Sequence, residues 1–159
     1  KENLDICDFL IKSGANINAE NKDDLDENKD DLDKNKGTPL HLAVEKESLK
    51  MCEFLIDNGA DINDKNFEGW TPLHIALGKG NLEICKFLIK RGADIDATTN
   101  KNHTPLHFAA EKENLEICEI LIERGADKNK EDINGKKPSF YIKNNNYLLL
   151  NLFKNNTEE

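Results

Sequence analysis

The sequence lacks two features that would place it among membrane-spanning or nucleic-acid-binding proteins. Its longest mostly apolar segment, 147–153, is interrupted by Asn151 and falls far short of the roughly 20 residues that cross a bilayer. Basic residues are scarce, because 22 Lys and Arg stand against 31 Asp and Glu, a formal net charge of −9. A protein that binds the phosphate backbone needs a basic surface. We therefore expect no membrane insertion and no nucleic-acid partner.

The sequence also lacks the motifs of common enzymes and cofactor sites. None of its serines stands in a G-x-S-x-G context, and it has neither a P-loop nor a Rossmann glycine pattern. Its carboxylates stand in polar segments where water solvates them, so none is set apart as a general acid or base. We expect no catalytic residue, no cofactor and no enzymatic activity within this chain.

What the chain does contain is an internal repeat with a period of 33 residues. A fixed period assigns every residue within it to a position of the repeat, so equivalent residues are expected to share one structural role. The string TPLH recurs at Thr38, Thr71 and Thr104. The string NLEIC or a close variant begins at Asn3, Ser48, Asn81 and Asn114, and a third string beginning GAN or GAD follows at Gly14, Gly59, Gly92 and Gly125.

The spacing within one unit predicts two helices and an extended connector. Thr is a good N-cap and Pro suits the first helical position, so TPLH predicts the start of a short first helix. Leu82, Cys85 and Ile89 lie at i, i+3 and i+7, which predicts a second, longer helix that Gly92 ends. We expect this second helix to be the more buried of the two. The polar segment that follows predicts a turn-rich connector to the next TPLH.

These strings resemble the ankyrin repeat, for which T-P-L-H-x-A at a 33-residue period is a signature. The resemblance implies an all-α fold, an ankyrin-repeat solenoid of stacked helix-turn-helix units with hairpin-like connectors. It also implies that the side chains of His41, His74 and His107 hydrogen-bond the connector turns of adjacent repeats. One helix pair cannot bury both of its faces, so the units must stack.

Counting from TPLH gives the expected organisation of the chain. Residues 1–19 hold only the second helix and connector of a partial repeat, and complete repeats follow at 35–67, 68–100 and 101–133. Residues 134–159 keep Pro138 but lose the rest of TPLH, which predicts a degenerate capping repeat. In this cap we expect Leu148 and Leu150 to take the positions of Leu115 and Ile117.

An acidic insert, 20–34, separates the partial repeat from the first complete one. It arises by duplication, since DDLDENK from Asp23 is followed by DDLDKNK from Asp30. Its high charge and low apolar content predict a mobile loop. Its spaced acidic residues resemble part of a calcium loop, but Lys29 and Lys36 stand where the turn glycine belongs. We expect no calcium site there.

The N-terminal edge is expected to be incomplete. The TPLH that should precede Leu4 would fall before Lys1. We infer further repeats upstream, and an apolar edge formed by Leu4, Cys7 and Ile11. An apolar area that a further repeat would cover favours self-association through this edge.

The repeated cysteines and histidines do not predict disulfides or a metal site. Residues one period apart lie on neighbouring helices about 8–10 Å apart, whereas a disulfide needs Cα atoms within about 7 Å. Cys7, Cys52, Cys85 and Cys118 are therefore expected to be reduced and metal-free, as in a cytoplasmic or otherwise intracellular protein.

Since no catalytic, cofactor or metal site is expected, we expect the function of the chain to reside in its surface. The resemblance implies that a protein partner binds the connector tips and the outer face of the first helix. The leading hypothesis is a non-catalytic interaction module of a scaffold or adaptor, and the alternative is a substrate-docking segment of a larger enzyme or host-directed effector. The candidate partner-binding residues are Phe67, Glu68, Trp70, Lys79, Lys101, His103, Glu111, Lys112, Ile133 and Lys136.

Phe67 and Trp70 stand out in this set, because the other connectors hold polar residues at these positions. Two interpretations remain open. Trp70 lies flat on the neighbouring connector and staples adjacent repeats, or it forms a binding hot spot with Phe67, since Trp is enriched where a few residues carry most of the binding energy.

Overall fold

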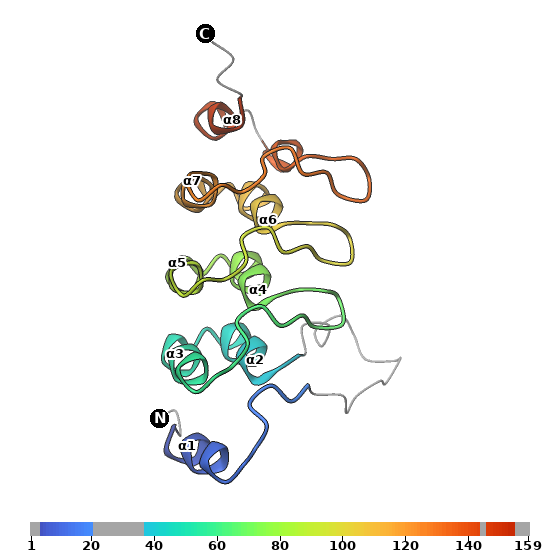
Figure 1. The fold of residues 1–159 in the computed structure, drawn as a ribbon. Helices are drawn as coiled ribbons and strands as arrows, with labels where there is room; N and C mark the ends of the chain where they lie inside the picture. The colour runs from blue at the N-terminus through green and yellow to red at the C-terminus, as the bar shows by residue number, and fades with distance from the viewer. Residues whose placement is uncertain (1–3, 21–36, 144–145, 155–159) are drawn as a thin grey trace.

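The computed structural model describes residues 4–20, 37–143 and 146–154 (Figure 1). The helices, in chain order, are α1 (Leu4–Lys12), α2 (Pro39–Glu45), α3 (Leu49–Asp57), α4 (Pro72–Lys79), α5 (Leu82–Lys90), α6 (Pro105–Glu111), α7 (Leu115–Glu123), the 3-10 helix η2 (Pro138–Tyr141) and α8 (Tyr147–Phe153). No strand occurs within these described ranges. The expected all-α fold is therefore confirmed. Among the same helices, none combines the length and apolar character needed to cross a bilayer.

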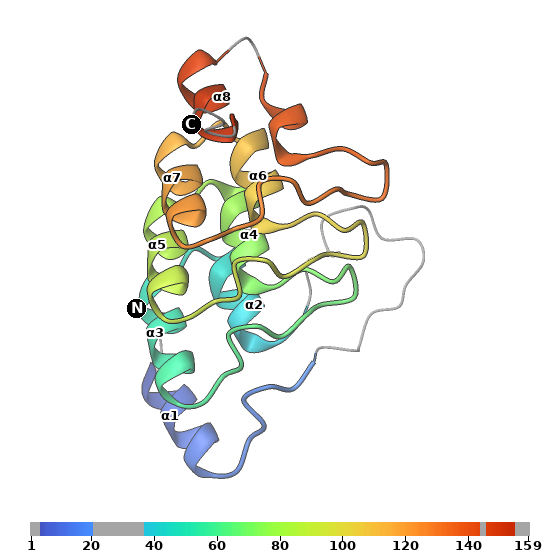
Figure 2. The same ribbon diagram turned by 45° about the horizontal axis from the view of Figure 1, so that its top comes forward.

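The helices stack in two columns, with the connectors projecting to one side. The second helices α3, α5 and α7 form the outer column, and the first helices α2, α4 and α6 stand between them and the connectors (Figure 1). Each first helix contacts its own second helix and the first helix of the next unit. The connectors lie side by side and point the same way (Figure 2). This is a solenoid, and the repeat boundaries drawn from the sequence remain our proposal.

Each TPLH string starts a first helix through a reciprocal contact between Thr and His. The N–H of Thr38 donates to Nδ1 of His41 at 3.1 Å, and the Thr38 hydroxyl lies 2.9 Å from the same nitrogen. The same contacts recur at Thr71 with His74 and at Thr104 with His107. The histidine thus shares the capping with the threonine. Because Nδ1 accepts from an N–H, a neutral ring carries its proton on Nε2.

The same histidines tie adjacent repeats together at two of the three positions. Nε2 of His41 lies 3.0 Å from the carbonyl of Trp70, and Nε2 of His107 lies 3.2 Å from the carbonyl of Lys136. The expected bond between repeats is therefore present at both. Nε2 of His74 is buried and has no hydrogen-bond partner in the described part of the chain. The ring of Phe108 packs against His74 instead, with centroids 5.4 Å apart.

The second helices are longer than the first, as expected, but the prediction that they are more deeply buried is wrong. Each of α3, α5 and α7 has 9 residues, against 7 or 8 in the first helices. Six residues of α4 and six of α6 are buried, against four of α5 and three of α7. The reason is the layering, since second helices cover one side of a first helix and connectors the other (Figure 1).

The C-terminal cap departs from the expected register by one residue. Asn146 caps α8 by accepting the N–H of Leu149, as Asn114 caps α7 by accepting the N–H of Ile117. Leu149, with 0% exposure, therefore takes the position of Ile117, while Leu148 is 71% exposed. The expected match of Leu148 and Leu150 to Leu115 and Ile117 is wrong. A 3-10 helix of 4 residues replaces the first α-helix of this unit, and one residue fewer separates its proline from the next cap.

The exposed apolar residues of the N-terminal edge are not the expected Leu4, Cys7 and Ile11, which are half-buried. Helix α1 has no buried residue, and the side chains of Ile6, Phe9 and Leu10 are exposed. A groove of about 390 Å³ lies between α1 and the pair α2 and α3, with Cys7 and Leu42 among its lining residues. Self-association through this edge stays a prediction. The acidic insert, expected to be a mobile loop, lies outside the described residues except for Glu20.

No disulfide joins the four cysteines, all of which lie in the described part of the chain, and their burial predicts their reactivity. Cys52, Cys85 and Cys118 are buried, whereas Cys7 is half-buried. Burial raises the pKa of Cys85 and of Cys118 to about 12, which removes the reactive thiolate at neutral pH. With Ellman's reagent we expect one thiol per chain to react quickly and the other three only after unfolding. From the sequence alone, which places all four cysteines at the same repeat position, we would predict no fast reaction, and the half-buried Cys7 changes this prediction. Fast labelling of Cys85 or Cys118 would contradict the burial of the second helices.

Candidate functional site

The connector tips are built the same way in three successive units, by three different side chains. Asn66, Thr99 and Asp132 are buried and one period apart. The side-chain oxygen of each accepts two backbone N–H groups, from the residues two and four positions later. Each such oxygen closes a turn from within. The turns therefore hold the tip side chains in fixed positions.

Neighbouring tips are also bonded to one another. The N–H of Asn100 donates to the carbonyl of Glu68 at 3.0 Å, and the N–H of Ile133 donates to the carbonyl of Lys101 at 3.2 Å. The side-chain amide of Asn100 donates to the carbonyl of Phe67 at 2.8 Å. These bonds make the tips one continuous surface along the stack (Figure 2).

A left-handed residue completes each tip. Gly69, Asn102 and Gly135 have φ of 73°, 57° and 71°. Asn is among the residues that tolerate this region. Asn102 thus takes the place that a glycine has in the other two connectors.

Half of the candidate partner-binding residues line one cavity. Glu68 and Trp70 come from one tip, Lys101 and His103 from the next, and Glu111 from the end of α6. Together with Phe108 of α6 they surround a cavity of about 260 Å³. The stack thus brings together residues that lie one repeat apart in the sequence.

Trp70 shares features of both interpretations that the sequence left open. Its ring packs edge-on against Phe108, with centroids 4.9 Å apart. It nevertheless stays half-buried, and it also lines a second cavity of about 180 Å³ beside Gly78 and Lys79. Trp70 therefore joins adjacent repeats and presents ring surface to two cavities.

The other candidates lie around these cavities or on the tips. Phe67 and Ile133 are each 59% exposed. The Lys79 ammonium pairs with the Glu45 carboxylate at 2.5 Å. Lys112 follows the last residue of α6 as its C-cap, and the Lys136 ammonium lies 4.1 Å from the centroid of the Phe140 ring.

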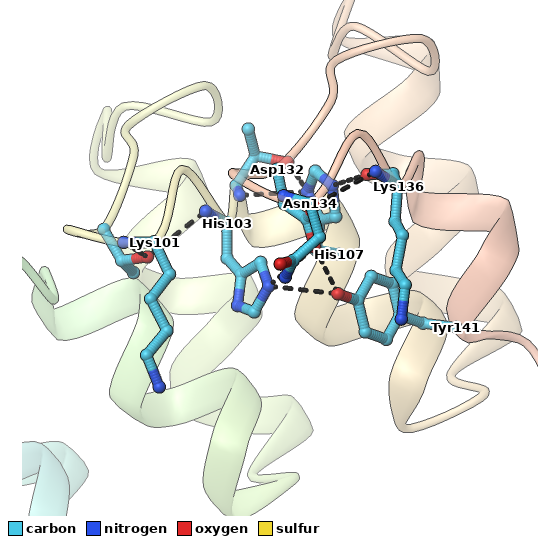
Figure 3. Close-up of polar contacts among 9 residues, drawn as sticks. Lys101, His103, His107, Asp132, Asn134, Lys136 and Tyr141 are labelled. Atoms are coloured by element: carbon cyan, nitrogen blue, oxygen red, sulfur yellow. Dashed lines mark hydrogen bonds and ion pairs between the residues drawn. The ribbon is translucent and has the colours of Figure 1, made fainter.

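A polar network fixes His103 at the edge of the first cavity (Figure 3). Nε2 of His103 lies 3.2 Å from the Asp132 carboxylate and 3.2 Å from the Tyr141 hydroxyl. The Tyr141 hydroxyl donates to the same carboxylate. The Lys101 side chain extends away from this network (Figure 3). His103 is thus held by groups from the next connector and from η2.

The hydrogen bonds of the network keep the Asp132 side chain in its ionised, carboxylate form. Burial alone would raise the pKa of Asp132, but hydrogen bonds from Tyr141, from the N–H groups of Lys136 and Asn134 and from His103 hold it well below its usual range. Burial and the hydrogen bond to Asp132 raise the pKa of Tyr141 to about 12. Both Asp132 oxygens are occupied by donors. The carboxylate therefore anchors its neighbours and is poorly placed to act as a base.

Sequence reasoning missed three residues of this region, Phe108, Asp132 and Tyr141. Phe108 stands where Leu42 and Ile75 stand in the other units, and this change of side chain was a visible signal. Asp132 repeats the position of Asn66 and Thr99, which was also visible. Tyr141 belongs to the degenerate unit, where no repeat position predicts its contact. No group of three or more His, Cys, Asp or Glu suited to a metal ion occurs among the described residues.

Comparisons with known proteins agree with this geometry. Family models described as ankyrin repeats match residues 1–22, 24–76 and 63–132. A comparison with curated proteins gives no match. Ankyrin repeats generally mediate protein–protein interactions. With family matches across most of its length and the stacked helix pairs described above, the chain belongs to the ankyrin repeat family.

Proposed function

We propose that this chain is a non-catalytic interaction module that binds a protein partner through its tip face. We use that name for the surface formed by Phe67, Glu68, Trp70, Lys101, His103 and Glu111. The observation that carries the proposal is the cavity of about 260 Å³ that five of these residues line. Phe67, which precedes Glu68 on the same connector, adds an exposed aromatic ring. Aromatic residues at the centre of a contact surface are common hot spots.

The rigidity of the tip face supports binding. Buried side chains close each turn, hydrogen bonds join neighbouring tips, and His103 is fixed by Asp132 and Tyr141. A surface that is already ordered loses less conformational entropy when it binds. We also propose an intracellular location, since a chain whose described cysteines form no disulfide fits a reducing compartment.

The double change Phe67→Ala and Trp70→Ala tests the proposal. With a partner isolated by affinity purification on the full chain, we expect a binding loss of roughly 2 kcal/mol or more, about 30-fold in Kd. Isothermal titration calorimetry measures this loss. The change Phe67→Ala alone should weaken binding without lowering the melting temperature, because that ring is 59% exposed.

A matched control is Phe9→Ala, which removes a 68% exposed aromatic ring from α1. It should leave Kd unchanged. If the double variant melts several degrees lower yet binds the partner with unchanged Kd, the two aromatics are structural and the partner binds elsewhere. Equal weakening by the Phe9 change would likewise move the binding surface to α1.

A further inference from the structure

Aromatic rings from three elements line the cavity of the tip face. The Phe108 ring lies between the other two, with its centroid 4.9 Å from Trp70 and 5.8 Å from His103. The planes cross at 72° and 83°, so the rings form a corner and not a parallel stack. Aromatic rings attract a cation placed within about 6 Å of the ring centroid.

The charged groups of the same cavity favour a positive occupant. Glu68 and Glu111 line it together with a single lysine, Lys101. Neither carboxylate has an ion-pair partner among the described residues, whereas nearby Glu45 is paired with Lys79. A negatively charged occupant would gain Lys101 but would face both carboxylates. The net negative lining therefore matches a cation.

The size of the cavity points to one side chain. Sites for drug-sized ligands measure about 300–1,000 Å³, and this cavity measures about 260 Å³. The wall formed by His103 is fixed in advance, because its Nε2 already contacts Asp132 and Tyr141 (Figure 3). A preformed wall lowers the entropic penalty of binding.

We propose that this cavity receives the positively charged side chain of an arginine or lysine from the partner protein, against Trp70 and Phe108 and between the carboxylates of Glu68 and Glu111. The proposal rests on the proposed function, since it names the partner chemistry that the tip face recognises.

Trp70 is the chain's single tryptophan and lines the cavity, so its fluorescence is expected to change when the cavity is occupied. Its fluorescence can be titrated at constant ionic strength with Nα-acetyl-arginine amide. The neutral isostere, Nα-acetyl-citrulline amide, serves as the control. We expect saturable binding of the arginine probe on the order of millimolar Kd, and at least tenfold weaker binding of the citrulline probe. Backbone amide shifts of Lys101 and His103 in the same titration detect binding that fluorescence misses.

The double change Glu68→Gln and Glu111→Gln should weaken the arginine probe at least fivefold without changing the fold, which circular dichroism checks. The matched control Glu119→Gln removes an exposed carboxylate from α7 and should change nothing. The proposal is wrong if both probes bind equally well, or if Nα-acetyl-glutamate amide binds better than the arginine probe. It is also wrong if the arginine probe does not bind at concentrations up to about 50 mM, or if the double variant binds it with unchanged affinity.

The two proposals fail in different ways. If the partner is lost with Phe67→Ala and Trp70→Ala but binds normally to the Glu68 and Glu111 variant, the tip face binds the partner without a cation. If neither variant changes the affinity for the partner, both proposals are wrong.

Discussion

Acidification from pH 7.5 to 4 is expected to lower the free energy of unfolding by at least about 3 kcal/mol, because His74 must stay neutral in the fold. Burial lowers the pKa of His74 from 6.5 to about 4. The unfolded chain therefore binds a proton that the folded chain rejects. The stability that neutral His74 contributes is fully present above pH 6.5 and is lost as the pH falls toward 4. Because the pKa differs by about 2.5 between the unfolded and folded chains, this contribution is about 3 kcal/mol.

The other two histidines of the TPLH strings add to the same loss. Burial also lowers the pKa of His41 and of His107. Protonation of Nδ1 would bring a second donor against the capping N–H of Thr38 or Thr104. The lowered pKa of Asp132 acts in the same direction at lower pH, since the stability that it contributes is present above the ordinary carboxylate pKa and is lost only as the pH falls below about 4.

Urea denaturation at several values between pH 7.5 and 4 measures the effect. The variant His74→Asn keeps an acceptor for the N–H of Thr71 but cannot be protonated, so its stability should depend less on pH. An unfolding free energy that stays constant over this range in the unmodified chain would show that the three imidazoles are not buried as described.

Gly69→Ala is expected to destabilise the chain by about 3 kcal/mol, through crowding and backbone strain together. A Cβ on Gly69 would lie 2.6 Å from Oδ1 and 2.8 Å from the backbone nitrogen of Asn100. That nitrogen belongs to the N–H that bonds the Glu68 carbonyl, so the clash would open the contact between two tips. The φ of Gly69, 73°, adds the strain of a left-handed alanine.

Gly135→Ala separates the two causes. Gly135 has nearly the same φ, 71°, but the nearest atom to a Cβ there is 4.0 Å away. This variant should lose only about 1 kcal/mol, the strain of the left-handed conformation. Thermal unfolding of both variants gives the comparison. Equal losses would mean that the tips of adjacent connectors are not packed against each other at Gly69.

The helix positions could be predicted from the sequence because their signals are local. Thr-Pro starts a first helix and Gly92 ends a second one, whatever the neighbours are. Burial depth and the register of the cap could not be predicted in this way. Burial depends on what covers each side of a helix. The cap register depends on Asn146 serving as an N-cap one residue earlier than the repeat period requires.

The site was predictable to the extent that the period places residues on one surface. Trp70 and His103 are 33 residues apart, and the stack brings both to the same cavity. The cavity itself was not predictable, because it depends on Phe108, at a position where the other units hold an aliphatic side chain. The network that fixes His103 depends on Tyr141, in a unit that no longer follows the repeat.

Site-specific photo-crosslinking in cells tests the central claim most directly. Benzoylphenylalanine is placed in the full chain at Phe67, on the tip face, and in a matched chain at Glu119, which is exposed on α7 of the outer column. If the partner binds the tip face, adducts form from position 67 and not from position 119. Adducts from position 119 with none from position 67 would contradict the proposed function.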